Sequence, residues 1–267
     1  MEKLQTLVHD DHEALARRVA AAMAATIRAA NAEGRHAVLG LATGSPPIGV
    51  YRELIRLHRD DGLSFARVVT FNLDEYYPMD PDSLHSYHRF MREHLFNHID
   101  IDPANVHLPS GLVPRTDLDG YCTEYEAAIA AAGGIDLQLL GIGKTGHIGF
   151  NEPGSGSRSR TRLVTLDTVT RRDAAADFFG EASVPREAIT MGVSTILEAR
   201  QIAILATGEH KAGIVRRAVE GAVDTEVAAT FLQHHPSPTW CSWPAISPTR
   251  TEPTASARRR SISPWLG

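Results

Sequence analysis

A histidine and a glutamate stand five residues apart in a glycine-rich stretch of the sequence. The stretch runs Gly141-x-Gly143-x-x-Gly146-His147 and continues into Phe150-Asn-Glu152-Pro153. An imidazole and a carboxylate on one loop can share proton transfer, because imidazole exchanges protons near neutral pH. A solvated histidine on a surface loop is the alternative interpretation of this motif in isolation.

The spacing of Gly141, Gly143 and Gly146 also fits the G-x-G-x-x-G pattern of dinucleotide-binding turns. That pattern requires the glycines to start a helix, with an acid about 20 residues further on at the end of a second strand. Here the stretch continues into a loop, and no acid stands at such a strand end. We therefore expect no nicotinamide cofactor.

Two adjacent acids, Asp74 and Glu75, follow the apolar run of residues 67–71. Neighbouring side chains point to opposite sides of extended backbone, so only one of the two is expected to face a crevice. The other is expected to cap a helix or to pair with a base. A carboxylate at the mouth of a closed crevice can act as a general base, since burial raises its pKa.

Donors suited to a phosphate occur in three places. Thr43-Gly44-Ser45 forms a turn between a predicted strand and a predicted helix, where backbone N–H groups and the helix start attract an anion. Lys211 follows another predicted strand, and Arg171 or Arg172 could hold a phosphate bidentately. An ordinary turn and solvated surface cations are the alternatives. The full Walker pattern is absent, so no nucleoside triphosphate is implied.

The elements that must position these residues alternate along the chain. Apolar residues at helical spacing from Ala14 to Ile27 predict a helix that ends near Gly34, and short apolar runs predict strands at 36–42, 67–71, 135–140 and 201–206. This alternation predicts an α/β fold with an open, doubly wound, mostly parallel, Rossmann-like sheet and helices on both faces. Ligands bind beyond the carboxyl ends of such strands, so the four loops there should converge.

The composition limits the possible partners. The chain has 267 residues, 43% hydrophobic, with a formal net charge of −5, which provides no overall attraction to nucleic acid or to an anionic membrane. Cys122 and Cys241 form no C-x-x-C or zinc pattern. No apolar run reaches the roughly 20 residues that span a bilayer, and Met1 to Asp11 do not resemble a secretory signal. We expect a soluble, cytoplasmic protein.

One domain is expected over residues 1–236, because no linker or repeat divides it. Residues 237–267 differ in composition: they contain all three tryptophans, five of the 15 prolines and the run Arg258–Arg260. We expect this segment to be poorly packed or disordered, as a shifted reading frame would make it, with loss of a strand from the sheet.

Taken in order, the motifs resemble the glucosamine-6-phosphate deaminase family over roughly residues 8–236. The most specific stretch is G-H-I-x-F-N-E-P after the glycine loop. The matching segments are Leu39–Gly44, Val68–Tyr76, Gly141–Pro153, Ser159–Arg162, Ala188–Val193, Lys211 and Ala218–Gly221.

The resemblance implies that D-glucosamine 6-phosphate and water become D-fructose 6-phosphate and ammonia, with neither a metal nor an organic cofactor. Asp74 would move a proton between C2 and C1, and His147 would assist ring opening with help from Glu152. The substrate, including its phosphate, would be held by Thr43, Gly44, Ser45, Gly143, Lys211 and one arginine, preferably Arg171. The resemblance allows a monomer or a homo-oligomer.

This chain departs from the family at Thr145. The best-known members have an aspartate two residues before the histidine, and that aspartate belongs to the ring-opening relay. A threonine cannot supply a negative charge to orient or stabilise the imidazole, and loss of an orienting acid can be severe. Glu152 or water would take over this role, or ring opening would be slower, or the substrate would differ. The chain looks like a member of a branch with threonine here.

Several rivals share parts of this pattern. A 6-phosphogluconolactonase has a G-H loop but typically continues with threonine-alanine instead of F-N-E-P. A galactosamine-6-phosphate deaminase or isomerase would differ by one hydroxyl contact. A non-catalytic sugar-phosphate sensor would bind substrate and release no ammonia. A zinc nucleobase deaminase is excluded because H-x-E and P-C-x-x-C are missing.

Overall fold

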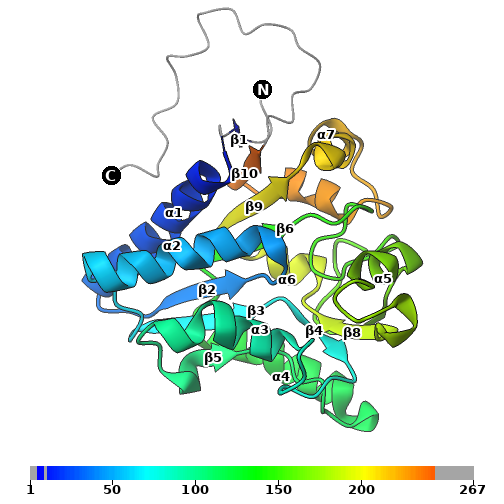
Figure 1. The fold of residues 1–267 in the computed structure, drawn as a ribbon, viewed down its shortest axis with the longest axis horizontal. Helices are drawn as coiled ribbons and strands as arrows, with labels where there is room; N and C mark the ends of the chain where they lie inside the picture. The colour runs from blue at the N-terminus through cyan, green and yellow to red at the C-terminus, as the bar shows by residue number, and fades with distance from the viewer. Residues whose placement is uncertain (1–4, 9–10, 244–267) are drawn as a thin grey trace, which may run out of the picture.

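The structure is a computed structural model that describes residues 5–8 and 11–243. Within these residues the main sheet has seven parallel strands in the order β1-β10-β9-β6-β2-β3-β5 (Figure 1). Its strands are β1 (Gln5–Val8), β2 (Ala37–Leu41), β3 (Val68–Asn72), β5 (Val106–His107), β6 (Leu137–Gly141), β9 (Gln201–Thr207) and β10 (Pro238–Trp243). The chain first adds β3 and β5 to one side of β2, and then returns to add β6 and β9 to the other. The predicted doubly wound sheet is confirmed, and its direction of winding reverses between β2 and β6.

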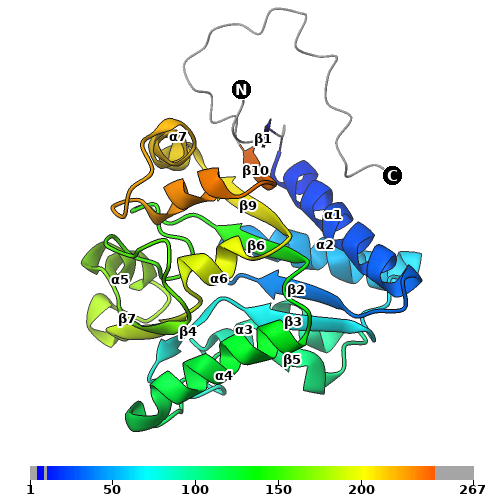
Figure 2. The same cartoon turned by 180° about the vertical axis from the view of Figure 1, so that it is seen from behind.

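Helices cover both faces of this sheet. On the face seen in Figure 1 are α1 (His12–Ala32), α2 (Ser45–Asp61) and α3 (Tyr87–His94). On the other face, seen in Figure 2, are α4 (Leu118–Ala131), α6 (Val193–Leu197) and α7 (Ala212–Glu220). The short helix α5 (Thr168–Ala174) lies on the side toward which the strands β2 and β3 point (Figure 1). Single turns and one longer segment of 3-10 helix complete the set: η1 (Phe96–His98), η2 (Pro103–Asn105), η3 (Arg115–Asp117), η4 (Glu181–Ser183), η5 (Glu209–Lys211) and η6 (Ala228–His234).

Strand β2 shows why the sheet is buried on both faces. Leu39 and Leu41 pack into the cluster formed with α1 and α2, whereas Val38 packs into the cluster on the other face. Because successive side chains of a strand point to opposite faces, a strand covered on both sides needs a continuous apolar run. That requirement is met by the sequence Ala-Val-Leu-Gly-Leu, in which every residue is buried.

Local signals fix the start and the end of α2, the helix that follows β2. Its N-cap is Gly44 at φ +93°, a backbone conformation that L side chains rarely adopt. Pro46 and Pro47 follow in the first turn, where a missing N–H is tolerated. The helix ends at Gly62, which is left-handed and donates its N–H to the carbonyl of Leu57.

A second, antiparallel sheet stands beside the main one, and the alternation of strands and helices did not predict it. Its strands lie in the order β4 (Asp74–Tyr77), β8 (Glu187–Thr190) and β7 (Arg162–Thr165). Strand β4 follows β3 after a single residue, Leu73, and its Tyr76 packs with Phe150 and Phe178 in a separate core cluster. Asp74, the first residue of β4, therefore lies in the small sheet just after the carboxyl end of β3.

The segment after Ser237 contains a strand of the main sheet. Residues Pro238–Trp243 form β10, which pairs in parallel with both β1 and β9. The expectation that a strand is lost here is therefore wrong for residues 238–243. The rest of the proposed tail, residues 244–267, lies outside the described residues.

Candidate functional site

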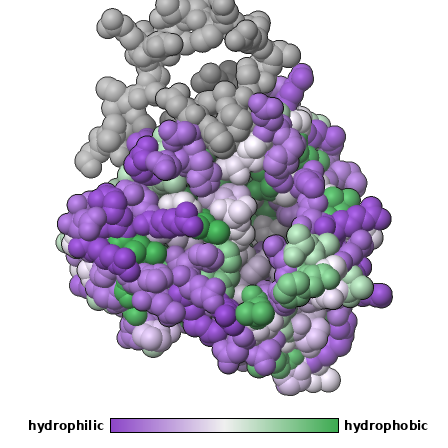
Figure 3. Space-filling view, in the orientation of Figure 1, coloured by the Kyte–Doolittle hydropathy of each residue, from purple (hydrophilic) through white to green (hydrophobic). Residues whose placement is uncertain are grey.

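A cavity of about 470 Å³ opens at the point where the winding of the main sheet reverses. The four loops that the sequence predicted to converge all contribute to it, and that prediction is confirmed. The surface drawn in Figure 3 is hollowed near the end of α2 that faces α5. The cavity is lined by Ala42, Thr43, Ser45 and Pro46 after β2, Leu73 and Asp74 after β3, Gly141–Lys144, His147, Gly149 and Phe150 after β6, Thr207, His210 and Lys211 after β9, and Tyr87 and Asp173.

The adjacent acids Asp74 and Glu75 point to different places, as predicted. Asp74 lines the cavity and is 6% exposed, and burial raises its pKa from 3.8 to about 7. Glu75 is fully buried away from the cavity, and its Oε2 accepts hydrogen bonds from the N–H groups of Tyr87 (2.8 Å) and His88 (3.2 Å) at the start of α3. Asp74 is therefore the acid available for proton transfer, while Glu75 holds the first turn of α3.

The structure brings His147, Glu152 and Thr145 together. Oε2 of Glu152 lies 3.1 Å from Nδ1 of His147, and Oγ1 of Thr145 lies 2.9 Å from the same nitrogen. Thr170 of α5 adds a second hydroxyl, 3.4 Å from that nitrogen. A proton on Nδ1 is therefore directed at the carboxylate, which leaves Nε2 as the proton acceptor of the imidazole.

Glu152 supplies the negative charge that Thr145 lacks. Its side chain is 9% exposed, and burial raises its pKa. The hydrogen bond and charge of His147, together with hydrogen bonds from Thr170 and the N–H of Asp167, outweigh burial and lower the pKa below its ordinary value. A carboxylate that stays ionised beside Nδ1 can accept its proton in a hydrogen bond and hold the ring in one orientation. Glu152 can thus perform the role of an orienting acid.

Gly143 leaves the space in which the imidazole of His147 lies. A Cβ at this residue would overlap Nε2, Cε1 and Cδ2 of His147, so the ring lies directly over the glycine. Gly143 also donates its N–H to the carbonyl of His147 at 3.0 Å, which closes the loop. The residue therefore shapes the cavity through the space it leaves for the ring.

The loops after β2 and β9 contribute the part of the cavity that suits an anion. Thr43, Ser45 at the start of α2, and Lys211 all line it. Burial lowers the pKa of Lys211, Asp173 opposes that effect, and Lys144 adds to it. A phosphate here would meet hydroxyl groups, a helix N-terminus and an ammonium group.

The structure does not bring the two predicted arginines to the cavity. Arg171 donates from Nη2 to the carbonyl of Glu181 at 2.9 Å, and Arg172 lies 3.6 Å from the carboxylate of the same residue. Neither arginine lines the cavity. Both are turned toward η4 because α5 packs along that turn, so the choice of Arg171 is not supported by its position.

Lys144, Tyr87 and Asp173 line the cavity, and Thr170 contacts His147 beside it, but none of these four residues was predicted from the sequence. Lys144 could have been predicted from the sequence, because it is the one cation in the glycine loop after β6. Tyr87, Thr170 and Asp173 gave no signal, because they lie on helices far along the chain from the strand ends they approach. Within the described part of the chain, no group of three or more His, Cys, Asp or Glu side chains could hold a metal ion.

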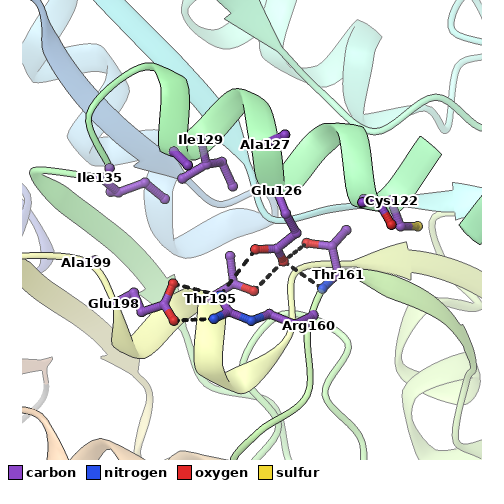
Figure 4. Close-up of a pocket in the computed structure, with 13 residues that line it drawn as sticks. Cys122, Glu126, Ala127, Ile129, Ile135, Arg160, Thr161, Thr195, Glu198 and Ala199 are labelled. Carbon is purple, nitrogen blue, oxygen red and sulfur yellow. Dashed lines mark hydrogen bonds and ion pairs between the residues drawn. The ribbon is translucent and has the colours of Figure 1, made fainter. Parts of the chain in front are cut away.

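A second cavity of about 480 Å³ lies between α4 and α6 (Figure 4). Its charged groups are paired with one another: Arg160 contacts Glu198 at 2.5 Å and Glu126 at 3.4 Å. Oε1 of Glu126 also accepts hydrogen bonds from the N–H and hydroxyl of Thr161 and from the hydroxyl of Thr195. Because these groups satisfy each other, the first cavity is the better candidate for chemistry.

Residues 10–240 match the family described as glucosamine-6-phosphate isomerases/6-phosphogluconolactonase, and the chain belongs to that family of sugar-phosphate proteins. The chain is 49% identical over 231 residues to the glucosamine-6-phosphate deaminase of Rhodopirellula baltica, covering 86% of this chain and 89% of that protein. It is 43% identical over 235 residues to a putative glucosamine-6-phosphate deaminase-like protein of Bacteroides thetaiotaomicron, but spans only 35% of that protein's length.

Solved structures are known for both activities in the family name, and they differ in how similar they are to this chain. A monomeric glucosamine-6-phosphate deaminase superposes with a TM-score of 0.86 at 41% identity, over 90% of this chain and 97% of that one. A 6-phosphogluconolactonase of Thermotoga maritima reaches a TM-score of 0.70 at 22% identity, over 90% and 99% of the two chains. The second likeness shows the shared fold alone. No helix of the described residues is long and apolar enough to cross a membrane.

Proposed function

We propose that this chain is a glucosamine-6-phosphate deaminase, which converts D-glucosamine 6-phosphate and water into D-fructose 6-phosphate and ammonia. The observation that carries the proposal is one cavity with a buried acid, Asp74, and a paired imidazole, His147, beside an anion-binding side at Lys211. The relatives named glucosamine-6-phosphate deaminase support the same activity.

Ring opening is the first step of the proposed reaction. His147 removes the proton of the C1 hydroxyl through Nε2, the bond between C1 and the ring oxygen breaks, and the imidazolium returns the proton to that oxygen. Glu152 stabilises the imidazolium because its carboxylate lies 3.1 Å from Nδ1. The step exchanges one proton and gives an open-chain aldehyde.

Isomerisation and loss of ammonia follow. Asp74 removes the proton from C2 of the aldehyde and delivers it to C1, while one proton passes from the amino nitrogen to the C1 oxygen, so that C1 becomes an alcohol and C2 an imine. Water adds to the imine carbon, and ammonia leaves with the bonding electrons of the C2–N bond, which gives the ketone. A carboxyl group whose pKa lies at about 7 can both accept and donate this proton near neutral pH.

An ammonia-release assay with glucosamine 6-phosphate tests the proposal, with galactosamine 6-phosphate and 6-phosphogluconolactone as competing substrates. We expect ammonia and fructose 6-phosphate in equal amounts from glucosamine 6-phosphate. Faster turnover of the epimer or hydrolysis of the lactone would replace the proposed substrate. Binding without ammonia release would make the chain a sensor.

We further propose the biological setting. Glucosamine 6-phosphate arises where N-acetylglucosamine is broken down, so the reaction belongs to amino-sugar catabolism. A charged sugar phosphate does not cross a lipid bilayer unaided, and we propose that the enzyme acts with its substrate in the cytoplasm. The conversion as written consumes only water, with His147 moving the proton of ring opening and Asp74 moving the proton between C2 and C1.

A further inference from the structure

Lys144 belongs to a cluster of three charged residues at the cavity. Its ammonium lies 2.5 Å from Oδ1 of Asp173 on α5, and both residues line the cavity together with Lys211. Lys211 is close enough to both for Asp173 to attract it and Lys144 to repel it. We call Lys144, Asp173 and Lys211 the charge cluster.

An anion at the cavity would meet few positive groups besides Lys211. In the first turn of α2, Pro46 and Pro47 carry no N–H, so the helix start offers fewer backbone donors than most. No arginine is among the residues that line the cavity in the described chain. The side chain of Lys144 supplies the second ammonium there.

The position of Asp173 is not explained by helix stability. It lies one residue from the end of α5, and a carboxylate at a helix C-terminus is opposed by the dipole of the helix. Its pairing with Lys144 joins side chains that are 36% and 52% exposed, so the attraction is weak and reversible in water. A phosphate dianion carries about twice the charge of a carboxylate and can compete for the same ammonium.

We propose that Lys144 is a second phosphate-binding residue of this chain and that Asp173 is the anion with which the substrate phosphate competes for it. The proposal deepens the proposed function, because the ligand is the phosphate of that substrate. The ammonium of Lys144 leaves Asp173 and turns to the phosphate, which then lies between Lys144 and Lys211. Asp173 thereby weakens phosphate binding, and it lets product leave more readily.

Calorimetric titration with inorganic phosphate tests this without turnover. Lys144→Met should weaken phosphate binding about 10-fold, as expected for loss of one charge-assisted contact. Asp173→Asn should strengthen it about 2- to 5-fold, the value of a partly exposed ion pair, and most of that gain should vanish when Lys144 is also replaced. Unchanged binding in Lys144→Met would overturn the proposal.

Arg172→Met is the matched control, because it removes a positive charge from α5 next to Asp173 but outside the cavity. It should change phosphate affinity less than about 2-fold at physiological salt, since exposed charges are screened beyond about 8 Å. A loss equal to that of Lys144→Met would mean that general charge, not contact, governs binding, and would also overturn the proposal. Thermal melting of each variant shows that it is folded.

Kinetics separate this proposal from the proposed function. In an active enzyme, Lys144→Met should raise KM for glucosamine 6-phosphate about 10-fold and change kcat less than about 3-fold, because a phosphate contact is made equally in the ground and transition states. If the wild-type protein releases no ammonia, the proposed function fails, but the phosphate titration still decides the role of Lys144. A loss confined to kcat would contradict a binding role.

Discussion

Oε2 of Glu152 lies 3.1 Å from Nδ1 of His147. The hydroxyl of Thr145 is closer to that nitrogen, at 2.9 Å, but carries no charge. Both ends of the contact between Glu152 and His147 are fixed. The N–H of Asp167 donates to Oε1 of Glu152 at 3.4 Å, and Thr170 reaches the Nδ1 side of the pair from α5. A carboxylate positioned to orient the imidazole is therefore present, and it stands five residues after the histidine in the sequence.

Replacing Glu152 with glutamine should strongly reduce activity. The amide has no negative charge for the imidazolium, and its NH2 group can turn toward Nδ1 and favour the wrong tautomer. We expect kcat/KM to fall by about 10³- to 10⁴-fold, the effect of losing an orienting acid in a comparable pair. The ammonia assay measures this, and Glu152→Asp should recover part of the loss. Near-normal activity of Glu152→Gln would show that water or Thr145 suffices.

Replacing Thr145 with aspartate should not increase activity. Oγ1 of Thr145 lies 3.5 Å from Oε2 of Glu152, so a carboxylate at residue 145 would stand next to an ionised one. Like charges at that distance disfavour joint ionisation, so one of the two acids would take up a proton at higher pH than Glu152 does now. We therefore expect kcat/KM in the ammonia assay to stay at or below the wild-type value. A gain above about 10-fold would show that the site is short of negative charge.

The sequence predicted the part of the site that depends on strand ends. Parallel strands end at one edge, so the loops after β2, β3, β6 and β9 had to meet, and Asp74 and Glu75 had to face apart because strand geometry alternates. No such rule predicts where the side chain of Arg171 points. Its direction depends on how α5 packs against η4, which is a tertiary contact, and the same packing brings Asp173 to Lys144. Strand β10 was missed because the composition of residues 238–243 does not indicate a strand. They form one because they pair with β1 and β9.

Asp74→Asn should abolish activity and stabilise the fold. The amide cannot accept a proton from C2, so we expect kcat to fall by at least about 10²- to 10⁴-fold. In the wild type, kcat/KM should rise with pH through about 7 as the Asp74 carboxyl ionises. Full activity of the variant would exclude Asp74 as the base.

The stability of Asp74→Asn follows from the raised pKa. In the folded state Asp74 keeps its proton up to about pH 7, whereas in the unfolded chain it loses it at about 3.8. The wild type therefore loses stability relative to the variant as pH rises from about 4 to 7, and the difference stays constant above that. Urea denaturation at pH 8 should show a gain of roughly 1–3 kcal/mol for the variant, and little gain at pH 3.5. A less stable variant at pH 8 would contradict burial as the cause.

Gly143→Ala should displace the imidazole of His147. The added methyl group would occupy the space of the ring, so either His147 or the loop must move, and a shift of about 1 Å in a catalytic group can cost about 10²-fold. Kinetics should show the loss mainly in kcat. Gly156→Ala is the control, because a Cβ there meets nothing within 4 Å and its backbone is not left-handed. Equal losses in both variants would point to a general effect of replacing glycine.

Glu126→Ala should destabilise the fold at the cluster drawn in Figure 4. Oε1 of Glu126 accepts from the N–H of Thr161 at 2.8 Å, from its hydroxyl at 2.6 Å and from the hydroxyl of Thr195 at 2.5 Å. The contact joins α4, α6 and the loop before β7, and its loss leaves donors without a partner in a partly buried place. We expect the free energy of unfolding to fall by about 1–3 kcal/mol in urea denaturation.

Glu124→Ala is the matched control for this variant. Glu124 lies on the same helix, two residues earlier on its exposed side, so removing it tests the loss of one acid from α4 without the loss of the cluster. Its effect should stay within about 0.5 kcal/mol. Equal effects of the two substitutions would assign the loss to helix charge. Because the cluster lies apart from the cavity at Asp74, Glu126→Ala should also leave the KM for glucosamine 6-phosphate near the wild-type value as long as the protein is folded.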